Sequence, residues 1–183
     1  MIPSEGDALA LHKKYGSNDR IVKHCKTVAG VSRVVAEELA RKGKPVDSRV
    51  VIAGALLHDI GRSRVQTVAH GLEGARILEG EGVDGNVVEV VRRHVGAGLD
   101  PAEAKALGLP DLDYIPRTLE ERVVCFADKM VDSDVVRPFD GEVQRFVKKG
   151  HDVERLLRLK KGLADDLGSD PEELVLRKIN QHR

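Results

Sequence analysis

The sequence predicts an all-α protein, because apolar residues recur at helical spacing along nearly the whole chain and no segment alternates as a strand does. Glycine and proline interrupt this pattern at intervals suited to helix ends. The length of 183 residues suits one domain with a sizeable core. We therefore expect a lead-in helix over 1–17, a helical core of five or more helices over 18–140, and a helical C-terminal extension over 141–183 that packs on the same domain.

After the lead-in helix, the first half of the chain predicts four more helices. Asn18 lies in a polar triplet that can cap a long helix, and Gly43 followed by Pro45 can end it. Asp47 can cap the next helix. The expected helices cover about 20–42, 47–59, 70–78 and 84–95.

The second half begins with a loop. Residues 96–116 are rich in Gly, Pro and Asp, which favours a connecting segment with at most a small helix over 102–107. Thr118 and Glu121 have the spacing of a capping box and predict a helix that continues through Val131.

The last third predicts two or three more helices, broken at Gly150 and at 168–171. Within it, the stretch 153–167 has heptad-like apolar spacing. It could pack against a partner or a second copy in a homodimer, although a helix that covers the domain's own core is the simpler interpretation.

The composition narrows the class of protein. Lysine plus arginine equals aspartate plus glutamate, so no global charge favours nucleic acid, and we do not expect a nucleic-acid partner. Cys25 and Cys125 lack the spacing of a metal or redox motif and are expected to be buried free thiols. Neither a signal peptide nor an apolar run of about 20 residues is evident. We expect a cytoplasmic protein without a membrane contact.

The pair His58-Asp59 closes the apolar run 50–57. A buried carboxylate without a partner costs several kcal/mol, on the order of the transfer penalty for an unpaired polar group. A metal ion would compensate it, and the adjacent imidazole offers a second ligand.

Three more polar residues lie on apolar helix faces. His24 shares a stripe with Ile21 and Val28, and His94 and Asp128 are placed similarly. Each residue alone is more simply a hydrogen-bonded core residue or a buried ion pair. Their occurrence together favours metal binding.

The ordered motifs resemble the HD superfamily of metal-dependent phosphohydrolases. They are His24 in a long first helix, Ala-Leu-Leu-His-Asp-Ile-Gly over 55–61, and Asp128 in Phe-Ala-Asp-Lys, and the resemblance covers about 18–140. It implies that one metal is bound by His24, His58, Asp59 and Asp128.

His70 and His94 match the two extra histidines of the binuclear subgroup, in which the HD aspartate, here Asp59, bridges two metals. Within that subgroup the chain is most similar to bacterial HD-type hydrolases that split diadenosine tetraphosphate symmetrically. Arg20 and Arg137 also have counterparts there.

This resemblance implies two divalent ions, of Fe, Mn, Co, Ni or Zn, with Mg possible, and a bridging hydroxide as nucleophile. Asp59, Arg20 and Arg62 are the expected catalytic residues. The cations expected to bind substrate phosphate are Arg20, Arg62, Lys129 and Arg137, with an ion pair to a neighbouring acid as the alternative for Lys129.

The expected function is hydrolysis of a phosphate ester or anhydride in a phosphorylated small molecule, with a nucleotide or dinucleotide polyphosphate favoured. Tyr114 and Phe139 are the visible candidates for stacking a base. The alternatives are a nucleotide-sensing or regulatory module without turnover, and a phosphodiesterase that acts on a cyclic nucleotide or RNA. A di-iron oxygenase suits the ligands but not the surrounding basic residues.

Overall fold

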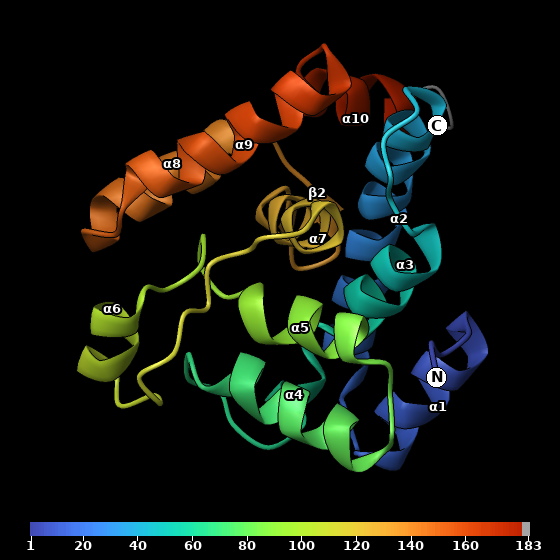
Figure 1. Ribbon diagram of the computed structural model, residues 1–183, viewed down its shortest axis with the longest axis vertical. Helices are drawn as coiled ribbons and strands as arrows, with labels where there is room; N and C mark the ends of the chain where they lie inside the picture. Colours follow the sequence, from blue (N-terminus) through green and yellow to red (C-terminus); the bar gives the residue numbers. More distant parts are fainter. Residues whose placement is uncertain (181–183) are drawn as a thin grey trace.

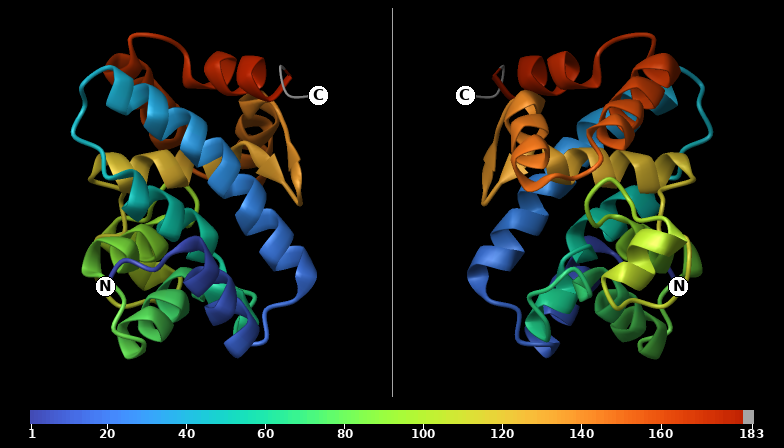
Figure 2. Two further views of the ribbon diagram at one scale, coloured as in Figure 1. Left: turned by 90° about the vertical axis from the view of Figure 1, so that its right-hand side faces the viewer. Right: turned by 90° about the vertical axis from the view of Figure 1, so that its left-hand side faces the viewer.

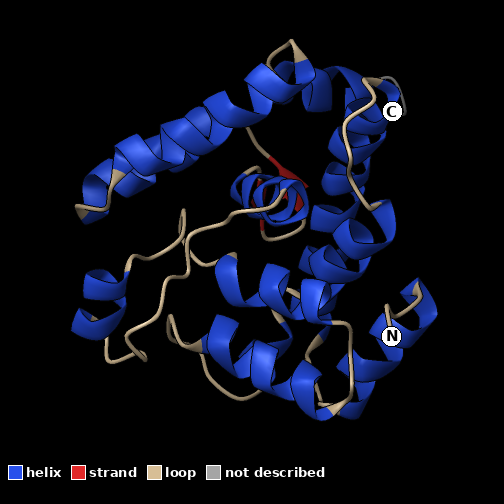
Figure 3. Ribbon diagram, viewed as in Figure 1, coloured by secondary structure: helices blue, strands red, loops and turns tan. Residues whose placement is uncertain are grey.

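The computed structural model describes residues 1–180 and confirms the all-α prediction (Figures 1 and 3). The helices in this range are α1 (Glu5–Lys14), α2 (Asp19–Arg41), α3 (Ser48–Leu57), α4 (His70–Gly80), α5 (Gly85–Arg93), α6 (Pro101–Ala106), α7 (Leu119–Lys129), α8 (Phe139–Lys149), α9 (Val153–Leu167) and α10 (Pro171–Asn180). A short 3-10 helix, η1 (Ile60–Ser63), follows α3, and a hairpin of β1 (Val131–Asp132) and β2 (Val135–Val136) follows α7.

The long helix α2 forms the spine of the core. Asn18 caps it, since its side chain accepts a hydrogen bond from the amide of Ile21. One face of α2 packs against α3 and α7, and α5 closes the other side of α3 (Figure 2). The buried stripe of α2 is made of Ile21, Cys25, Val28, Ala29, Val31, Ser32, Val35, Ala36 and Leu39.

The helix expected over 47–59 ends earlier. Asp47 caps α3 as predicted, but α3 stops at Leu57 and the chain tightens into η1. Periodicity predicted an uninterrupted helix because the apolar run continues through Ile60, which is fully buried. The polar pair lies at this break, so Asp59 is outside the regular hydrogen bonding of α3.

The helix expected through Val131 also ends early, at Lys129. Val131 pairs instead with Val136 in the hairpin, whose turn places Ser133 at a φ of 59°. Strands of two residues are too short for an alternation to be visible in the sequence, so this hairpin was not predicted.

The C-terminal helices pack on the same hydrophobic core as the first half of the chain. Gly150 and Gly168 end α8 and α9 in the left-handed conformation, as the glycine positions predicted. Leu156, Leu163 and Leu167 of α9 are fully buried in the shared core. This placement supports the interpretation that α9 covers the domain itself.

Within residues 1–180, no helix combines the length and the apolar character that crossing a bilayer requires. Both cysteines are free thiols and buried, as predicted.

Candidate metal centre

Four histidines and two aspartates from five helical segments meet in the interior. His24 comes from α2 and Asp128 from α7, while His58 ends α3 and is followed directly by Asp59. The remaining two histidines lie at the start of α4 and the end of α5. Donor atoms within 4.8 Å of one another form three overlapping groups: His24, His58 and Asp59; His58, His94 and Asp128; and Asp59, His70 and His94.

Asp59 lies between two pairs of histidines. Its Oδ1 is 3.1 Å from Nε2 of His70 and 3.5 Å from Nε2 of His94. Its Oδ2 is 4.0 Å from Nε2 of His24 and 3.8 Å from Nε2 of His58. Each carboxylate oxygen of Asp59 therefore faces a different pair, which is the geometry a bridging ligand needs.

Asp128 completes the side of the cluster that holds the first pair. Its Oδ1 lies 3.0 Å from Nε2 of His24 and 3.5 Å from Nε2 of His58. Its Oδ2 accepts a hydrogen bond from Lys129 at 2.5 Å. Lys129 was expected either to contact substrate or to pair with a neighbouring acid, and here it holds the second oxygen of Asp128.

Each histidine has its Nδ1 within hydrogen-bonding distance of a backbone carbonyl, so that Nε2 points inward. His58 faces the carbonyl of Ala55, His70 that of Thr67 and His94 that of Val91, at 2.7–2.8 Å. Each of these carbonyls belongs to the residue three positions earlier.

His24 is the exception, because its Nδ1 lies 2.8 Å from the carbonyl of Ser133, in the hairpin turn. An Nδ1–H donated to a carbonyl fixes the neutral imidazole in the tautomer with a free lone pair on Nε2.

This arrangement fits a cation. The Nε2 atoms of His70 and His94 lie 3.0 Å apart, and with both Nδ1 protons donated elsewhere their lone pairs face each other. Among the described residues, the buried Nε2 of His58 and Oδ1 of Asp59 have no hydrogen-bond partner of acceptable geometry. Buried polar atoms without partners are rare, and imidazole nitrogens with carboxylate oxygens suit a divalent transition metal.

Three of the six side chains have pKa values that suit metal ligands. Burial lowers the pKa of His94 to about 4, so it is neutral near pH 7. Burial by itself would raise the pKa of Asp59, but the neighbouring imidazoles, His58 first and then His70 and His94, outweigh it and hold the pKa well below its usual 3.8. Burial would also raise the pKa of Asp128. The positive charge of Lys129 is the main cause that opposes burial and keeps the pKa of Asp128 well below 3.8.

The predicted arginines differ in how close they come to the cluster. Arg62 reaches it, since its Nε lies 2.7 Å from Oδ2 of Asp59. Arg20 is exposed, and within residues 1–180 its one link to the cluster is through Ser133, whose Oγ lies 3.5 Å from its Nη2. The Arg137 side chain is exposed and, within the described residues, forms no hydrogen bond or ion pair with the cluster.

The cluster opens on one side. The side chains of His58 and His94 are 0% and 2% exposed, whereas those of His24 and Asp128 are 12% and 17% exposed. Arg62, beside them, is 32% exposed. A small molecule would therefore reach the centre past His24 and Asp128.

Glycines bring α4 close enough to supply His70. An added Cβ at Gly61 would lie 2.0 Å from the carbonyl oxygen of His70 and 2.5 Å from the amide nitrogen of Gly74. A Cβ at Gly71 would lie 2.8 Å from a methyl of Val95. The 3-10 helix η1 therefore touches the backbone of α4 directly.

Sequence reasoning missed the supporting roles of Gly61 and Ser133. The position of Gly61 shortly after the polar pair was a visible signal. No signal in the sequence pointed to Ser133, because it supports His24 through its backbone carbonyl, which every residue type has.

The expected base-stacking residues are not available. Tyr114 and Phe139 are 3% and 1% exposed, and the Phe139 ring stacks on Phe126 with ring centroids 5.3 Å apart. Sequence composition identified them only because aromatic residues are few, and both belong to the interior.

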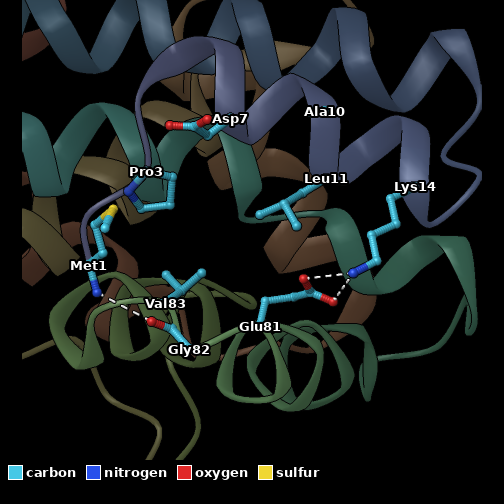
Figure 4. A pocket seen from close by; sticks show the side chains of 9 residues that line it. All are labelled: Met1, Pro3, Asp7, Ala10, Leu11, Lys14, Glu81, Gly82 and Val83. Carbon is cyan, nitrogen blue, oxygen red and sulfur yellow. Dashed lines mark hydrogen bonds and ion pairs between the residues drawn. The ribbon is translucent and has the colours of Figure 1, made fainter.

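A cavity of about 300 Å³ lies away from this centre (Figure 4). It is bounded by α1 and the turn between α4 and α5, and an ion pair of 2.7 Å between Lys14 and Glu81 crosses its edge. No member of the histidine and aspartate cluster lines it. The lining residues are Met1, Pro3, Asp7, Ala10, Leu11, Lys14, Glu81, Gly82 and Val83.

Comparison with known proteins gives a family match. The model of the HD domain family matches residues 21–131. A protein of Thermoplasma volcanium named tRNA (cytidine(56)-2'-O)-methyltransferase is 40% identical over 95% of this chain, and the match spans 51% of that relative. The chain thus spans about half the length of this curated relative. An uncharacterized protein of Methanocaldococcus jannaschii is 39% identical over 78% of this chain and 83% of its own length.

Among solved structures, the HD domain of the L. monocytogenes phosphodiesterase PgpH is similar with a TM-score of 0.60 at 18% identity. The superposition covers 94% of this chain and 99% of that domain. A structure of the same domain in complex with cyclic-di-AMP also matches, with a TM-score of 0.54 over 86% of this chain and 93% of that one. At this identity the likeness establishes the fold.

Proposed function

This chain belongs to the HD domain family, and we propose on that premise that it is a metal-dependent phosphohydrolase with a binuclear centre. The observation that carries the proposal is the position of Asp59, whose two oxygens face two separate histidine pairs. His24, His58 and Asp128 would hold one ion, His70 and His94 the other, and Asp59 both.

Bound divalent ions would lower the pKa of coordinated water toward neutrality and so supply the nucleophile for attack on phosphorus. The protein's own residues prepare the site. Carbonyls within reach of each histidine Nδ1 orient the imidazoles. Lys129 holds Asp128 in its ionised form, and Arg62 holds Asp59 in place. Arg62 is also exposed enough to contact a substrate phosphate and to stabilise the charge that builds up on its oxygens.

We propose a nucleotide or dinucleotide polyphosphate as substrate. The centre opens past His24 and Asp128, where a phosphate could approach both Arg62 and the ions. The solved HD domain that binds cyclic-di-AMP lends support at the level of fold only. The relative named as a tRNA methyltransferase is about twice as long, so its name raises RNA as a further phosphate-containing substrate to test.

The test is a screen of the full chain, stripped with chelator and reloaded in turn with Mn, Co, Ni, Fe, Zn or Mg. The substrates are nucleoside mono-, di- and triphosphates, diadenosine tetraphosphate, cyclic nucleotides and a short RNA. We expect phosphate or nucleotide release that depends on the metal and is lost in Asp59→Ala. Stoichiometric metal binding without turnover of any substrate would refute the enzyme and favour a nucleotide-sensing module.

A further inference from the structure

A second hollow adjoins the open side of the metal centre. It has a volume of about 260 Å³ and is lined by Arg20, Lys23, Ser133 and Asp134. Ser133 connects the two sites, since its carbonyl lies 2.8 Å from Nδ1 of His24 while its hydroxyl lies 3.5 Å from the guanidinium of Arg20. The hollow is therefore one residue away from a candidate metal ligand.

Two cations of this hollow have no acid partner in the part of the chain that the structure describes. Among the ion pairs of the described residues, which engage most arginines in the core domain, neither Arg20 nor Lys23 occurs. Both side chains are exposed and lie three residues apart, so they share one face of α2. A guanidinium and an ammonium on one face, beside a hydroxyl donor, suit the oxygens of a phosphate.

The far wall of the hollow is held in place. The hairpin lies beside the N-terminal half of α2 (Figure 2). Thr27 donates a hydrogen bond of 3.3 Å to the carbonyl of Asp134, one helical turn beyond His24. The Ser133 hydroxyl is thus presented from a fixed turn.

We propose that Arg20, Lys23 and the Ser133 hydroxyl form a phosphate subsite next to the first metal position. This inference rests on the proposed function and narrows its substrate to compounds that carry a second phosphate beside the one that is cut. A simple monoester would occupy the metals and leave the subsite empty. A nucleoside polyphosphate or dinucleoside polyphosphate would fill both.

Asp134 brings a negative charge to the same hollow. The charges of Arg20, Lys23 and Asp134 sum to +1. Removing the acid should strengthen binding of a polyanion, and removing a cation should weaken it. Because variants in one hollow are expected to change polyanion affinity in opposite directions, they distinguish a local binding site from a general loss of stability.

The first experiment measures tripolyphosphate binding to the chelator-treated full chain by titration calorimetry. We expect the Kd to rise at least fivefold in the double variant Arg20→Ala with Lys23→Ala, and to fall at least twofold in Asp134→Asn. Lys26→Ala is the matched control, because Lys26 is an exposed lysine of α2 that does not line the hollow. Its Kd should stay within twofold of the wild-type value. Equal Kd values in all four proteins would overturn the subsite.

The second experiment compares kcat/KM for tripolyphosphate with kcat/KM for phenyl phosphate in the metal-loaded proteins. The ratio should fall at least fivefold in the double variant and rise in Asp134→Asn. If the wild type cuts phenyl phosphate but the ratio is unchanged, the subsite is refuted and the phosphohydrolase stands. If tripolyphosphate binds as expected but nothing is cut with any metal, the proposed function fails and the subsite stands. Variants that alter binding of a short single-stranded RNA but not of tripolyphosphate would also refute the proposal.

Discussion

Replacing Gly61 by alanine is expected to separate the two halves of the metal centre. The added Cβ would lie 2.0 Å from the carbonyl oxygen of His70, whereas ordinary contact begins near 3.4 Å. The difference of 3.4 minus 2.0 requires α4 to retreat by about 1.4 Å. Both opposing atoms, the His70 oxygen and the Gly74 nitrogen, are backbone, so no side chain can rotate away.

The expected cost has two parts. Overpacking of this kind destabilises a protein by about 1–3 kcal/mol, and for a chain of this size about 2 kcal/mol lowers Tm by about 4–8 °C. In addition, His70 Nε2 moves away from Oδ1 of Asp59, now 3.1 Å distant. Metal–nitrogen bonds of about 2.0–2.1 Å tolerate errors of about 0.2 Å, so we expect the second ion to bind at least tenfold more weakly.

The assay combines calorimetric unfolding of the metal-free chain with metal content measured by inductively coupled plasma mass spectrometry. Gly80→Ala, in the facing helix α4, is the control, because an added Cβ there meets nothing within 4 Å. Alanine should stabilise that position by up to about 1 kcal/mol. A Gly61→Ala protein that keeps the wild-type Tm and metal content would refute the reasoning about the close contact of η1 with α4.

Three further predictions address the ligands and their support. Asp59→Ala should abolish metal binding almost completely, because it removes the one carboxylate that faces both histidine pairs, and dialysis followed by metal analysis measures this. His94→Ala should lower the metal content from two ions toward one, and a value that stays at two would contradict the binuclear proposal. Lys129→Met should move the acid-unfolding midpoint of the metal-free protein to higher pH, as followed by circular dichroism. The sign follows from the depressed pKa of Asp128. The ionised Asp128 stabilises the folded protein above the pKa that this group has in the unfolded chain, and that stabilisation is lost as the pH falls through its pKa in the folded protein. Removing the positive charge of Lys129 raises the folded pKa, so the stabilisation is lost at a higher pH.

Local patterns in the sequence were sufficient to predict most of the helices. Apolar periodicity, the caps at Asn18, Asp47 and Thr118, and the glycine stops at Gly150 and Gly168 all operate within a few residues, and the structure confirms each of them. The same periodicity failed where the chain departs from a regular helix without losing its apolar character. Those places are η1 after α3 and the two-residue strands after α7.

The sequence by itself pointed to the histidines and aspartates that the structure brings together, because a histidine or carboxylate on an apolar face can be recognised from its neighbours in one helix. Only the tertiary structure decided their relations. It set the direction of each oxygen of Asp59, the pairing of Lys129 with Asp128 and of Arg62 with Asp59, and the support of His24 by a hairpin more than a hundred residues away. The physical reason is that periodicity reports burial along one element, whereas distances between elements depend on how closely their backbones pack. Here the small size of Gly61 sets the closest approach.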